Sequence, residues 1–265
     1  MNYTSIFALT LLATAPAVAL NNISWVASTG DDTNPCIRTA PCKTFQTALN
    51  NTNPGGIIKA IDATDYGTVI VSKAITIDGN AVGAAIEAGN AVGIYIYAGP
   101  VTIRDLTIHL VPNGIGIETS ADTHIENVLI AGGPIYGVYT TGGRLTAKNL
   151  TVTGVVGTTD VFILGASASI RDSVFRGGQG VYVLSNAGSA AVALIERSEM
   201  SFNSNGLVAD NTGGGGATVR ISDCVITGNT NGVFTVNGGQ IISFRTNMLA
   251  GNTTDGAIPF SVSLK

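Results

Sequence analysis

The sequence predicts an all-β protein with one domain, a single-stranded parallel β-helix of about eight coils with an N-terminal α-helical cap. Three observations lead there. A polar residue recurs at a turn position, short segments with alternating apolar residues flank it, and a strand that begins with Gly follows in phase. No unit contains a segment with helical periodicity, which excludes leucine-rich and helical repeats. The 34 glycines among 265 residues fit strands joined by tight turns.

The recurring turn position sets the length of the repeat. Its occupants are separated by 22, 22, 23, 25, 26 and 23 residues along the chain. A period in this range indicates a solenoid, because no single unit can bury its own apolar face. The turn position is held by Asp105, Asn127, Asn149, Asp172, Arg197, Asp223 and Thr246.

The strands of successive units should pair in parallel, about 4.8 Å apart, because each coil runs in the same direction. Val219, Ile221, Cys224 and Ile226 alternate with polar residues, as strands with one buried face require. The equivalent residues Ile103, Ile125, Ile170 and Ile221 are expected to form one internal file. A β-propeller is disfavoured because its blades usually take about 40 residues or more.

The composition limits the classes of function. The net charge is −4, charged residues make up 11%, and the mean hydropathy is +0.36. The apolar excess is assigned to a filled interior. No later segment reaches the roughly 18 uncharged apolar residues of a membrane-spanning helix. No basic cluster is present, which disfavours nucleic-acid binding.

The N-terminus resembles a secretory signal, Met1–Ala19. A short apolar run, Ile6–Ala13, precedes the small-residue pattern Ala17-Val18-Ala19, so cleavage is expected after Ala19. No Lys or Arg stands before the apolar run, which departs from the usual pattern. The alternative is an ordinary apolar N-terminal helix. Export predicts a secreted, periplasmic or extracellular protein.

The rest of the chain, 20–265, is predicted to be one β-helix domain, with a cap over 20–56, coils over 57–252 and a C-terminal strand or cap over 253–265. Asn21–Ser28 is expected as a first strand. Pro41–Asn51 has a helical pattern with Phe45, Ala48 and Leu49 on one face, ended by 53–56. This helix would cover the open interior and the free strand edge of the first coil. Further strands are expected at 57–61, 68–71, 74–77 and 260–264.

Two of the three cysteines lie close together in a loop that contains proline. Cys36 and Cys42 form a disulfide if the chain is exported, and are otherwise two free thiols. Cys224 takes the place that Leu106, Val128 and Leu150 hold in other units. It is therefore expected as a small buried residue rather than a nucleophile.

The N-terminal block resembles that of bacterial exported right-handed parallel β-helix proteins of the pectin-lyase-like group. The residues that carry the resemblance are Gly30-Asp31, Asn34-Pro35-Cys36, Pro41 to Phe45, Ala48-Leu49 and Gly55-Gly56. The resemblance implies a right-handed coil and export. It implies no particular activity, because this fold hosts lyases, hydrolases, esterases, adhesins and proteins without known activity.

The catalytic patterns of that group are mostly missing. The paired Asp motifs and Gly-His-Gly of polygalacturonases do not occur. Asp31-Asp32 is the only Asp pair, and it suits turn and cap positions better than a Ca²⁺ site. No two carboxylates are neighbours in the turn column, which favours side chains that bond from coil to coil over a lyase metal site. No cofactor or metal is therefore expected, with Ca²⁺ as the open alternative.

Asp160 is a weak catalytic candidate. The stretch Gly157–Ile170 resembles the surroundings of a catalytic Asp in pectin methylesterases, where that Asp is a nucleophile or acid. Here an extra residue separates Asp160 from Gly165, and the other signatures of that family are absent. Asp160 also takes the position of the leading Gly in its unit, which predicts a turn residue instead.

The residues just before the turn position alternate mostly in charge. They are Arg104, Glu126, Lys148, Arg171, Glu196, Ser222 and Arg245. Opposite charges on adjacent strands are mildly favourable, which predicts a structural charge ladder. The alternative is a surface on which Arg104, Lys148 and Arg171 bind an acidic sugar chain.

Aromatic residues gather on the strands that begin with Gly. Tyr139, Phe162, Tyr182 and Phe234 stand two positions after the leading Gly or Asp, and would all face outward if the flanking Val and Ile face inward. Tyr95, Tyr97 and Tyr136 lie nearby. The strip is predicted to serve cross-strand packing or to be buried under a loop, or else to form a sugar-binding or docking surface.

Two functions follow from these patterns. The first is an exported, non-catalytic protein whose wall binds a polysaccharide or a cell-surface partner. The alternative is a carbohydrate-active enzyme of the pectin-lyase-like group, a polysaccharide lyase, a glycoside hydrolase or a pectin methylesterase-like enzyme. The missing catalytic sets favour the first, and the resemblance in fold favours the second.

Overall fold

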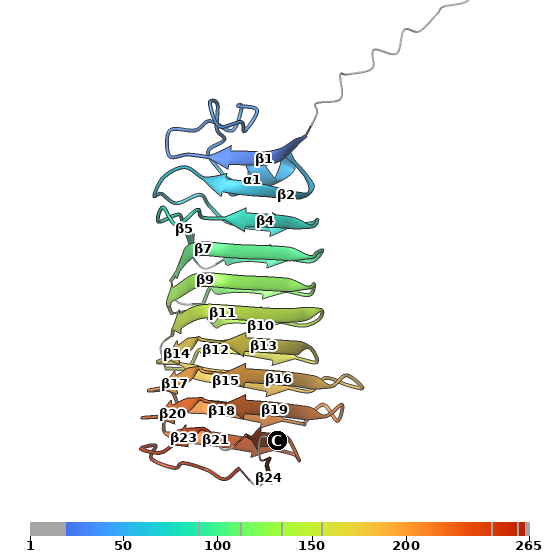
Figure 1. The fold of residues 1–265 in the computed structure, drawn as a ribbon, viewed down its shortest axis with the longest axis vertical. Helices are drawn as coiled ribbons and strands as arrows, with labels where there is room; N and C mark the ends of the chain where they lie inside the picture. Colours follow the sequence, from blue (N-terminus) through green and yellow to red (C-terminus); the bar gives the residue numbers. More distant parts are fainter. Residues whose placement is uncertain are drawn as a thin grey trace, which may run out of the picture.

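The computed structural model describes residues 20–262 apart from positions 90, 112, 134, 155, 245 and 259. The predicted signal segment, Arg245 and the last three residues lie outside the described part. The chain winds into a stack of parallel coils, with the first strand at one end and the last at the other (Figure 1).

Two parallel sheets form the walls of the coil. The sixteen-stranded sheet has the main strand order β1-β2-β4-β7-β9-β11-β13-β16-β19-β22-β24, and the eight-stranded sheet has the order β21-β18-β15-β12-β10-β8-β6-β3. Strands of neighbouring coils pair in parallel throughout, as the repeat predicted.

The sixteen-stranded sheet contains β1 (Asn21–Val26), β2 (Thr52–Ala60), β4 (Ile75–Asp78), β5 (Ala85–Gly89), β7 (Val101–Leu110), β9 (Thr123–Gly132), β11 (Arg144–Thr153), β13 (Ser167–Arg171), β14 (Val174–Arg176), β16 (Ala191–Glu196), β17 (Glu199–Ser201), β19 (Ala217–Ser222), β20 (Val225–Thr227), β22 (Gln240–Ser243), β23 (Met248–Leu249) and β24 (Phe260–Ser261). The eight-stranded sheet contains β3 (Val69–Val71), β6 (Val92–Ile96), β8 (Ile115–Thr119), β10 (Tyr136–Thr140), β12 (Thr159–Leu164), β15 (Gln179–Leu184), β18 (Asn205–Asp210) and β21 (Asn231–Val236).

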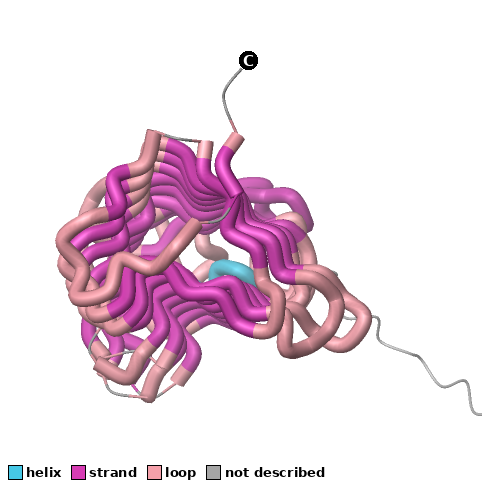
Figure 2. Tube along the Cα trace, turned by 90° about the horizontal axis from the view of Figure 1, so that it is seen from below, coloured by secondary structure: helices cyan, strands magenta, loops and turns pink. Residues whose placement is uncertain are grey.

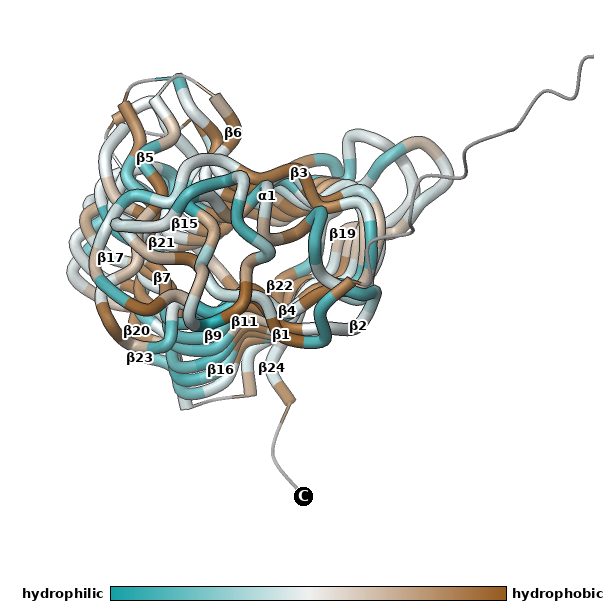
Figure 3. The backbone as a smooth tube through the Cα atoms, turned by 90° about the horizontal axis from the view of Figure 1, so that it is seen from above, coloured by the Kyte–Doolittle hydropathy of each residue, from teal (hydrophilic) through white to brown (hydrophobic). Residues whose placement is uncertain are grey.

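The predicted internal file is confirmed. Ile103 pairs in register with Ile125, and the same column continues through Ala147, Ile170, Ile195 and Ile221. All six side chains are buried. Because polar residues alternate with them along each strand, each wall has an apolar inner face and a polar outer face, an alternation visible along the strands in Figure 3.

The predicted turn column is also confirmed. Asp105, Asn127, Asn149, Asp172, Arg197 and Asp223 all have positive φ angles, between 46° and 57°. Each bends the chain between two strand segments at the same point of its coil. Asn and Asp tolerate this left-handed conformation because their short side chains bond locally, whereas Arg197 is an uncommon occupant.

The helical segment is shorter than predicted. Pro41–Asn51 was expected as the helix, but α1 spans only Phe45–Asn50, and the side chain of Thr44 caps it by accepting from the amide of Thr47 at 3.2 Å. The expected stop at 53–56 lies within β2. Asp32 fixes this start, because its carboxylate accepts from the amides of Lys43 and Thr44 at 2.9 Å.

A six-residue helix does not amount to the predicted cap over the free strand edge, because β1 pairs with β2 and is itself the outermost strand of the sixteen-stranded sheet. Viewed along the coil axis, the helix lies within the outline of the coil and over its interior (Figure 2). Phe45, Ala48 and Leu49 are buried there, as their shared face predicted.

The cysteines are placed as follows. Cys36 and Cys42 form a disulfide, and Cys224 is a buried free thiol. Within the described residues, no helix is long and apolar enough to cross a membrane.

Candidate functional site

The outward face of the eight-stranded sheet carries a column of side chains in register along the coil axis. In order, the column contains Ile70, Tyr95, Glu118, Tyr139, Phe162, Tyr182, Val208 and Phe234. The neighbouring positions Val138, Val161 and Val181 are fully buried, so the aromatic residues between them face outward. The predicted common position of Tyr139, Phe162, Tyr182 and Phe234 is thus correct.

Three rings in the middle of this column contact one another and also Tyr136, which lies beside the column on β10. We call these four rings the aromatic strip: Tyr136, Tyr139, Phe162 and Tyr182. The ring centroids of Tyr136 and Tyr139 are 5.0 Å apart, and those of Phe162 and Tyr182 are 5.3 Å apart, both pairs stacked. Tilted contacts of 5.2 and 5.6 Å join Phe162 to Tyr136 and to Tyr139. These separations fall within the favourable range for aromatic pairs.

The strip is interrupted at both ends. Val208, only 1% exposed, separates Tyr182 from Phe234, which is 50% exposed. Glu118 separates Tyr139 from Tyr95. Phe234 therefore lies on the same line without joining the contiguous rings, whereas Tyr136, named only as a neighbour in the sequence, belongs to them.

The strip is acidic at its margin. The hydroxyl of Tyr182 donates to Oδ2 of Asp210 at 2.6 Å, and burial together with this carboxylate raises the pKa of Tyr182 to about 12. Burial opposes ionisation of Asp210, but hydrogen bonds from Thr212 and Tyr182 hold its pKa below the ordinary value. Burial, with Tyr136 and Glu118 nearby, also raises the pKa of Tyr139. At neutral pH Tyr139 and Tyr182 are therefore neutral and Asp210 is charged.

The predicted cationic residues lie on a different wall. Arg104, Lys148 and Arg171 belong to β7, β11 and β13 of the sixteen-stranded sheet. Arg104 pairs with Asp78 at 2.7 Å and Lys148 with Glu126 at 3.1 Å, as a charge ladder predicts. Arg171 lies in register between Lys148 and Glu196. The structure thus separates the cationic candidates from the aromatic ones.

Asp160 is enclosed by the coil. Its side chain is fully buried, and neither carboxyl oxygen has a hydrogen-bond partner among the residues that the structure describes. Burial raises its pKa to about 9, so the carboxyl is neutral at neutral pH. No polymer reaches a carboxyl in this position, and the predicted catalytic role has no geometric support.

A second polar column lies inside the coil, and sequence reasoning missed it. Asn203, Asn229 and Asn252 follow β17, β20 and β23 and stack in successive coils. The amide of Asn203 donates to Oδ1 of Asn229 at 2.9 Å, and the amide of Asn229 donates to Oδ1 of Asn252 at 3.0 Å. The recurrence of Asn at steps of 26 and 23 residues, close to the repeat length, was the signal that could have revealed it.

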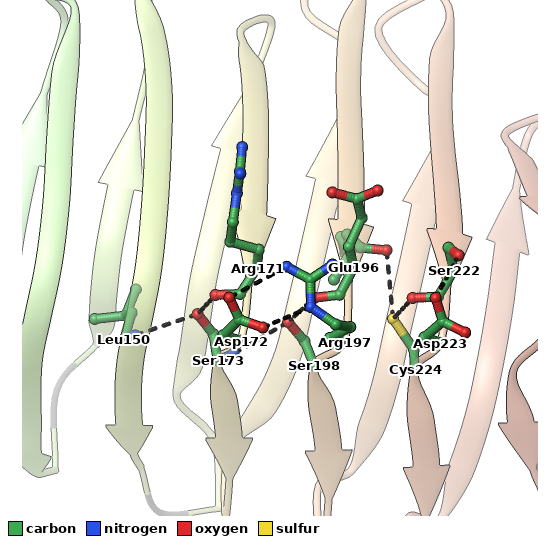
Figure 4. Close-up of polar contacts among 11 residues, drawn as sticks. Leu150, Arg171, Asp172, Ser173, Glu196, Arg197, Ser198, Ser222, Asp223 and Cys224 are labelled. Atoms are coloured by element: carbon green, nitrogen blue, oxygen red, sulfur yellow. Dashed lines mark hydrogen bonds and ion pairs between the residues drawn. The ribbon is translucent and has the colours of Figure 1, made fainter.

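The turn column shows the predicted bonding from coil to coil. Asn127 Nδ2 donates to Asp105 Oδ1 at 3.0 Å, and Asn149 Nδ2 donates to Asn127 Oδ1 at 2.9 Å. Further along, Arg197 Nε donates to Asp172 Oδ1 at 2.7 Å, and Figure 4 shows this pair beside Ser173, Ser198 and Asp223. Depressions of about 370 and 380 Å³ follow this column on the outer surface. Several of the polar side chains that line these depressions form hydrogen bonds with one another.

Metal-binding groups are dispersed. Among the described residues, no three His, Cys, Asp or Glu side chains come together in a way that could hold a metal ion. Asp31 accepts hydrogen bonds from the amide and hydroxyl of Thr33, at 2.8 and 2.7 Å, and therefore serves a local turn.

This chain resembles known proteins in its structure but matches none in the sequence comparisons. No family model and no curated protein matches the sequence. Pectate lyase Pel9A matches with a TM-score of 0.67 and 15% identity, over 91% of this chain and 78% of the lyase. An alginate lyase from Paenibacillus sp. str. FPU-7 matches at 0.45 and 14%, over 86% and 96% of the two chains. A GH136 lacto-N-biosidase from Eubacterium ramulus matches at 0.44 and 13%, over 92% and 67%. The likeness to Pel9A shows a shared fold.

Proposed function

We propose that this pectin-lyase-like β-helix protein binds an extended polysaccharide along the aromatic strip of its eight-stranded sheet. The observation that carries the proposal is the row of Tyr136, Tyr139, Phe162 and Tyr182, which spans three successive coils with ring centroids 5.0 to 5.6 Å apart. The outer face of each wall is otherwise mainly polar, so a contiguous row of aromatic residues there is an unusual use of surface.

The geometry of the coil suits a linear polymer. Successive strands lie about 4.8 Å apart, which is close to the length of one sugar in an extended chain. Aromatic rings pack against the C–H groups of sugars, and the Tyr136 and Tyr139 hydroxyls add hydrogen-bonding groups along the row. Tyr95 and Phe234, both exposed and in the same column, would extend the surface beyond the contiguous rings.

Substitution of the rings tests the proposal. The variants Tyr139→Ala and Phe162→Ala should each lower the affinity for a retained polysaccharide by about 10-fold, the usual cost of one lost aromatic contact. Affinity electrophoresis in gels that contain soluble polysaccharides supplies the first screen, and calorimetry measures the dissociation constant.

Met248→Ala is the matched control, because Met248 is an exposed apolar residue, 52% accessible, on β23 of the other sheet. It should bind as the wild type does. Retention that survives both ring substitutions, or that Met248→Ala weakens equally, contradicts the proposal. Circular dichroism of each variant separates loss of binding from loss of fold.

A second candidate function is that of a polysaccharide lyase or a related carbohydrate enzyme. The fold shared with pectate lyase Pel9A favours it. Incubation with pectate, alginate and methyl-esterified pectin, followed by ultraviolet absorbance of unsaturated products and titration of released acid, tests it. Turnover that survives Tyr139→Ala would place the chemistry away from the aromatic strip.

We also propose that the protein is exported and that α1 helps to close the first coil. The Cys36–Cys42 disulfide supports an oxidising compartment. Burial of Phe45, and the hydrogen bond of 2.8 Å from the Ile70 amide to Gln46 Oε1, support the closing role at β3. Cell fractionation tests export. Increased aggregation of a Phe45→Ala, Gln46→Ala variant tests closure.

A further inference from the structure

We infer that the aromatic strip selects an uncharged polysaccharide and discriminates against polyuronates, an inference that rests on the proposed function and names its ligand class. It is carried by the distribution of charge around the rings rather than by the rings themselves.

The sheet that bears the strip contains no cationic residue. None of its eight strands, β3, β6, β8, β10, β12, β15, β18 and β21, includes Lys, Arg or His. A polyuronate carries a carboxylate on every sugar, and proteins usually meet such charges with Arg or Lys. This face offers none.

Two carboxylates flank the rings instead. Glu118 stands in the column directly before Tyr139, about 4.8 Å along the axis, and no cation pairs with it in the described part of the chain. Asp210 receives the Tyr182 hydroxyl at 2.6 Å and the Thr212 hydroxyl at the other end of the strip. Both lie within one Debye length, about 8 Å at physiological ionic strength, of a polymer seated on the rings.

The cations that form ion pairs in the described part of the chain lie outside the sheet that bears the strip. Arg104, Lys148 and Arg176 form ion pairs of 2.7, 3.1 and 2.8 Å on strands of the sixteen-stranded sheet. A uronate on the strip would therefore face repulsion from Glu118 and Asp210 without compensation. A neutral sugar avoids this repulsion, and its hydroxyls can donate hydrogen bonds to Glu118. Asp210 is buried and already accepts from Tyr182 and Thr212, so it acts through its charge alone.

Matched pairs of oligosaccharides test the inference. Cellulose fragments and glucuronan fragments share a backbone and differ only in oxidation of the hydroxymethyl group, and manno-oligosaccharides and mannuronan fragments form a second pair. For at least one pair, the neutral member should bind at least about 10-fold more tightly at low salt, and the ratio should shrink as salt rises.

The variant Glu118→Gln sharpens the test. It should strengthen binding of the acidic member about 3-fold or more at low salt and change binding of the neutral member by less than about 2-fold. Glu87→Gln is the matched control, because Glu87 belongs to β5 in the other sheet, and it should change neither affinity.

The outcomes separate the two proposals. Acidic members that bind as well as or better than neutral ones, with binding lost in Tyr139→Ala, overturn the charge inference and leave polysaccharide binding in place. Equal affinities in Glu118→Gln and wild type also overturn it. If no neutral or acidic oligosaccharide or polysaccharide binds, the proposed function is wrong, and the charge inference that rests on it is wrong as well.

Discussion

The backbone amide of Asn203 donates a hydrogen bond of 2.9 Å to the side-chain oxygen of Asn229 in the next coil. The same relationship joins Asn229 to Asn252. The series stops at the preceding coil, where Gly178 aligns with Asn203. Within the described part of the chain, Oδ1 of Asn203 has no hydrogen-bond partner. The Asp160 carboxyl occupies this region, because its Oδ1 lies 2.8 Å from where a Cβ on Gly178 would be.

This arrangement predicts an unusual pH dependence of stability. The carboxyl of Asp160 has its pKa raised from 3.8 to about 9 by burial, so the folded protein holds a proton that the unfolded chain releases above pH 4. Its contribution to stability is fully present below about pH 4 and is lost as the pH rises through 9. Asp160→Asn keeps the shape and removes the charge.

Urea unfolding followed by circular dichroism from pH 4 to 9 checks this prediction. Asp160→Asn should match the wild type at pH 4 and exceed its free energy of unfolding by roughly 2–5 kcal/mol at pH 9. Asp210→Asn is the control. It should be destabilising near neutral pH, because Asp210 is charged and hydrogen-bonded. A constant difference between Asp160→Asn and wild type across the range contradicts the assignment.

The internal Asn column should matter more to stability than the external one. Asn229→Ala leaves the Asn203 amide and the Met200 carbonyl without their partners inside the coil. Each buried orphan group costs about 1–3 kcal/mol. Asn127→Gly, which removes exposed bonds but keeps the positive φ of 54°, should cost less than about 1 kcal/mol. Urea midpoints of the two variants give the comparison, and equal losses would argue against a buried column.

Two phenylalanines in nearby coils distinguish the inner and outer faces of the walls. Phe175 is fully buried, whereas Phe162 faces outward on the aromatic strip and is half-buried. Phe175→Ala should lower the free energy of unfolding by about 3–5 kcal/mol, because it leaves a cavity in the core. Phe162→Ala should cost less than half as much. Thermal or urea unfolding measures both losses. A larger loss of stability in Phe162→Ala than in Phe175→Ala would mean that the aromatic strip serves mainly to stabilise the fold.

The Cys36–Cys42 disulfide should stabilise the N-terminal end of the stack. It closes a loop with a sequence separation of 6, for which the chain-entropy effect is about 2 kcal/mol. Reduction, or the double variant Cys36→Ser, Cys42→Ser, should speed proteolysis of the first coil while Cys224 stays buried. Limited proteolysis with mass spectrometry locates the cuts. Cuts confined to the C-terminal coils would contradict the prediction.

The repeat, the parallel stacking and the internal file could all be predicted from the sequence, because these features depend on local alternation and on a regular period. The position of Asp105 and its equivalents was predictable because a single residue with positive φ must recur where each coil turns. The predicted helix was longer than α1, which spans Phe45–Asn50. Helical periodicity cannot show that the carboxylate of Asp32, eleven residues before Lys43, accepts from the amides of Lys43 and Thr44 and so fixes the start of α1.

The candidate site was only partly predictable. The common position of Tyr139, Phe162 and Tyr182 followed from spacing, and the same spacing from a Gly places Val208 and Glu118 in the column. The contacts of Tyr136 with these rings depend on how the side chains lie in space, which the spacing does not show. The two candidate surfaces, the cations Arg104, Lys148 and Arg171 and the aromatic rings, lie on different walls, which the sequence left open.

The sequence by itself determined that this chain is a stack of parallel coils and which side chains face outward, because periodicity of two within a strand and about 23 between coils is written in the order of residues. Only the tertiary structure decided which outward residues share a wall, which rings touch, and that Asp160 is enclosed beside Gly178. Those relationships join residues about 20 to 30 positions apart, and small differences in turn length set them.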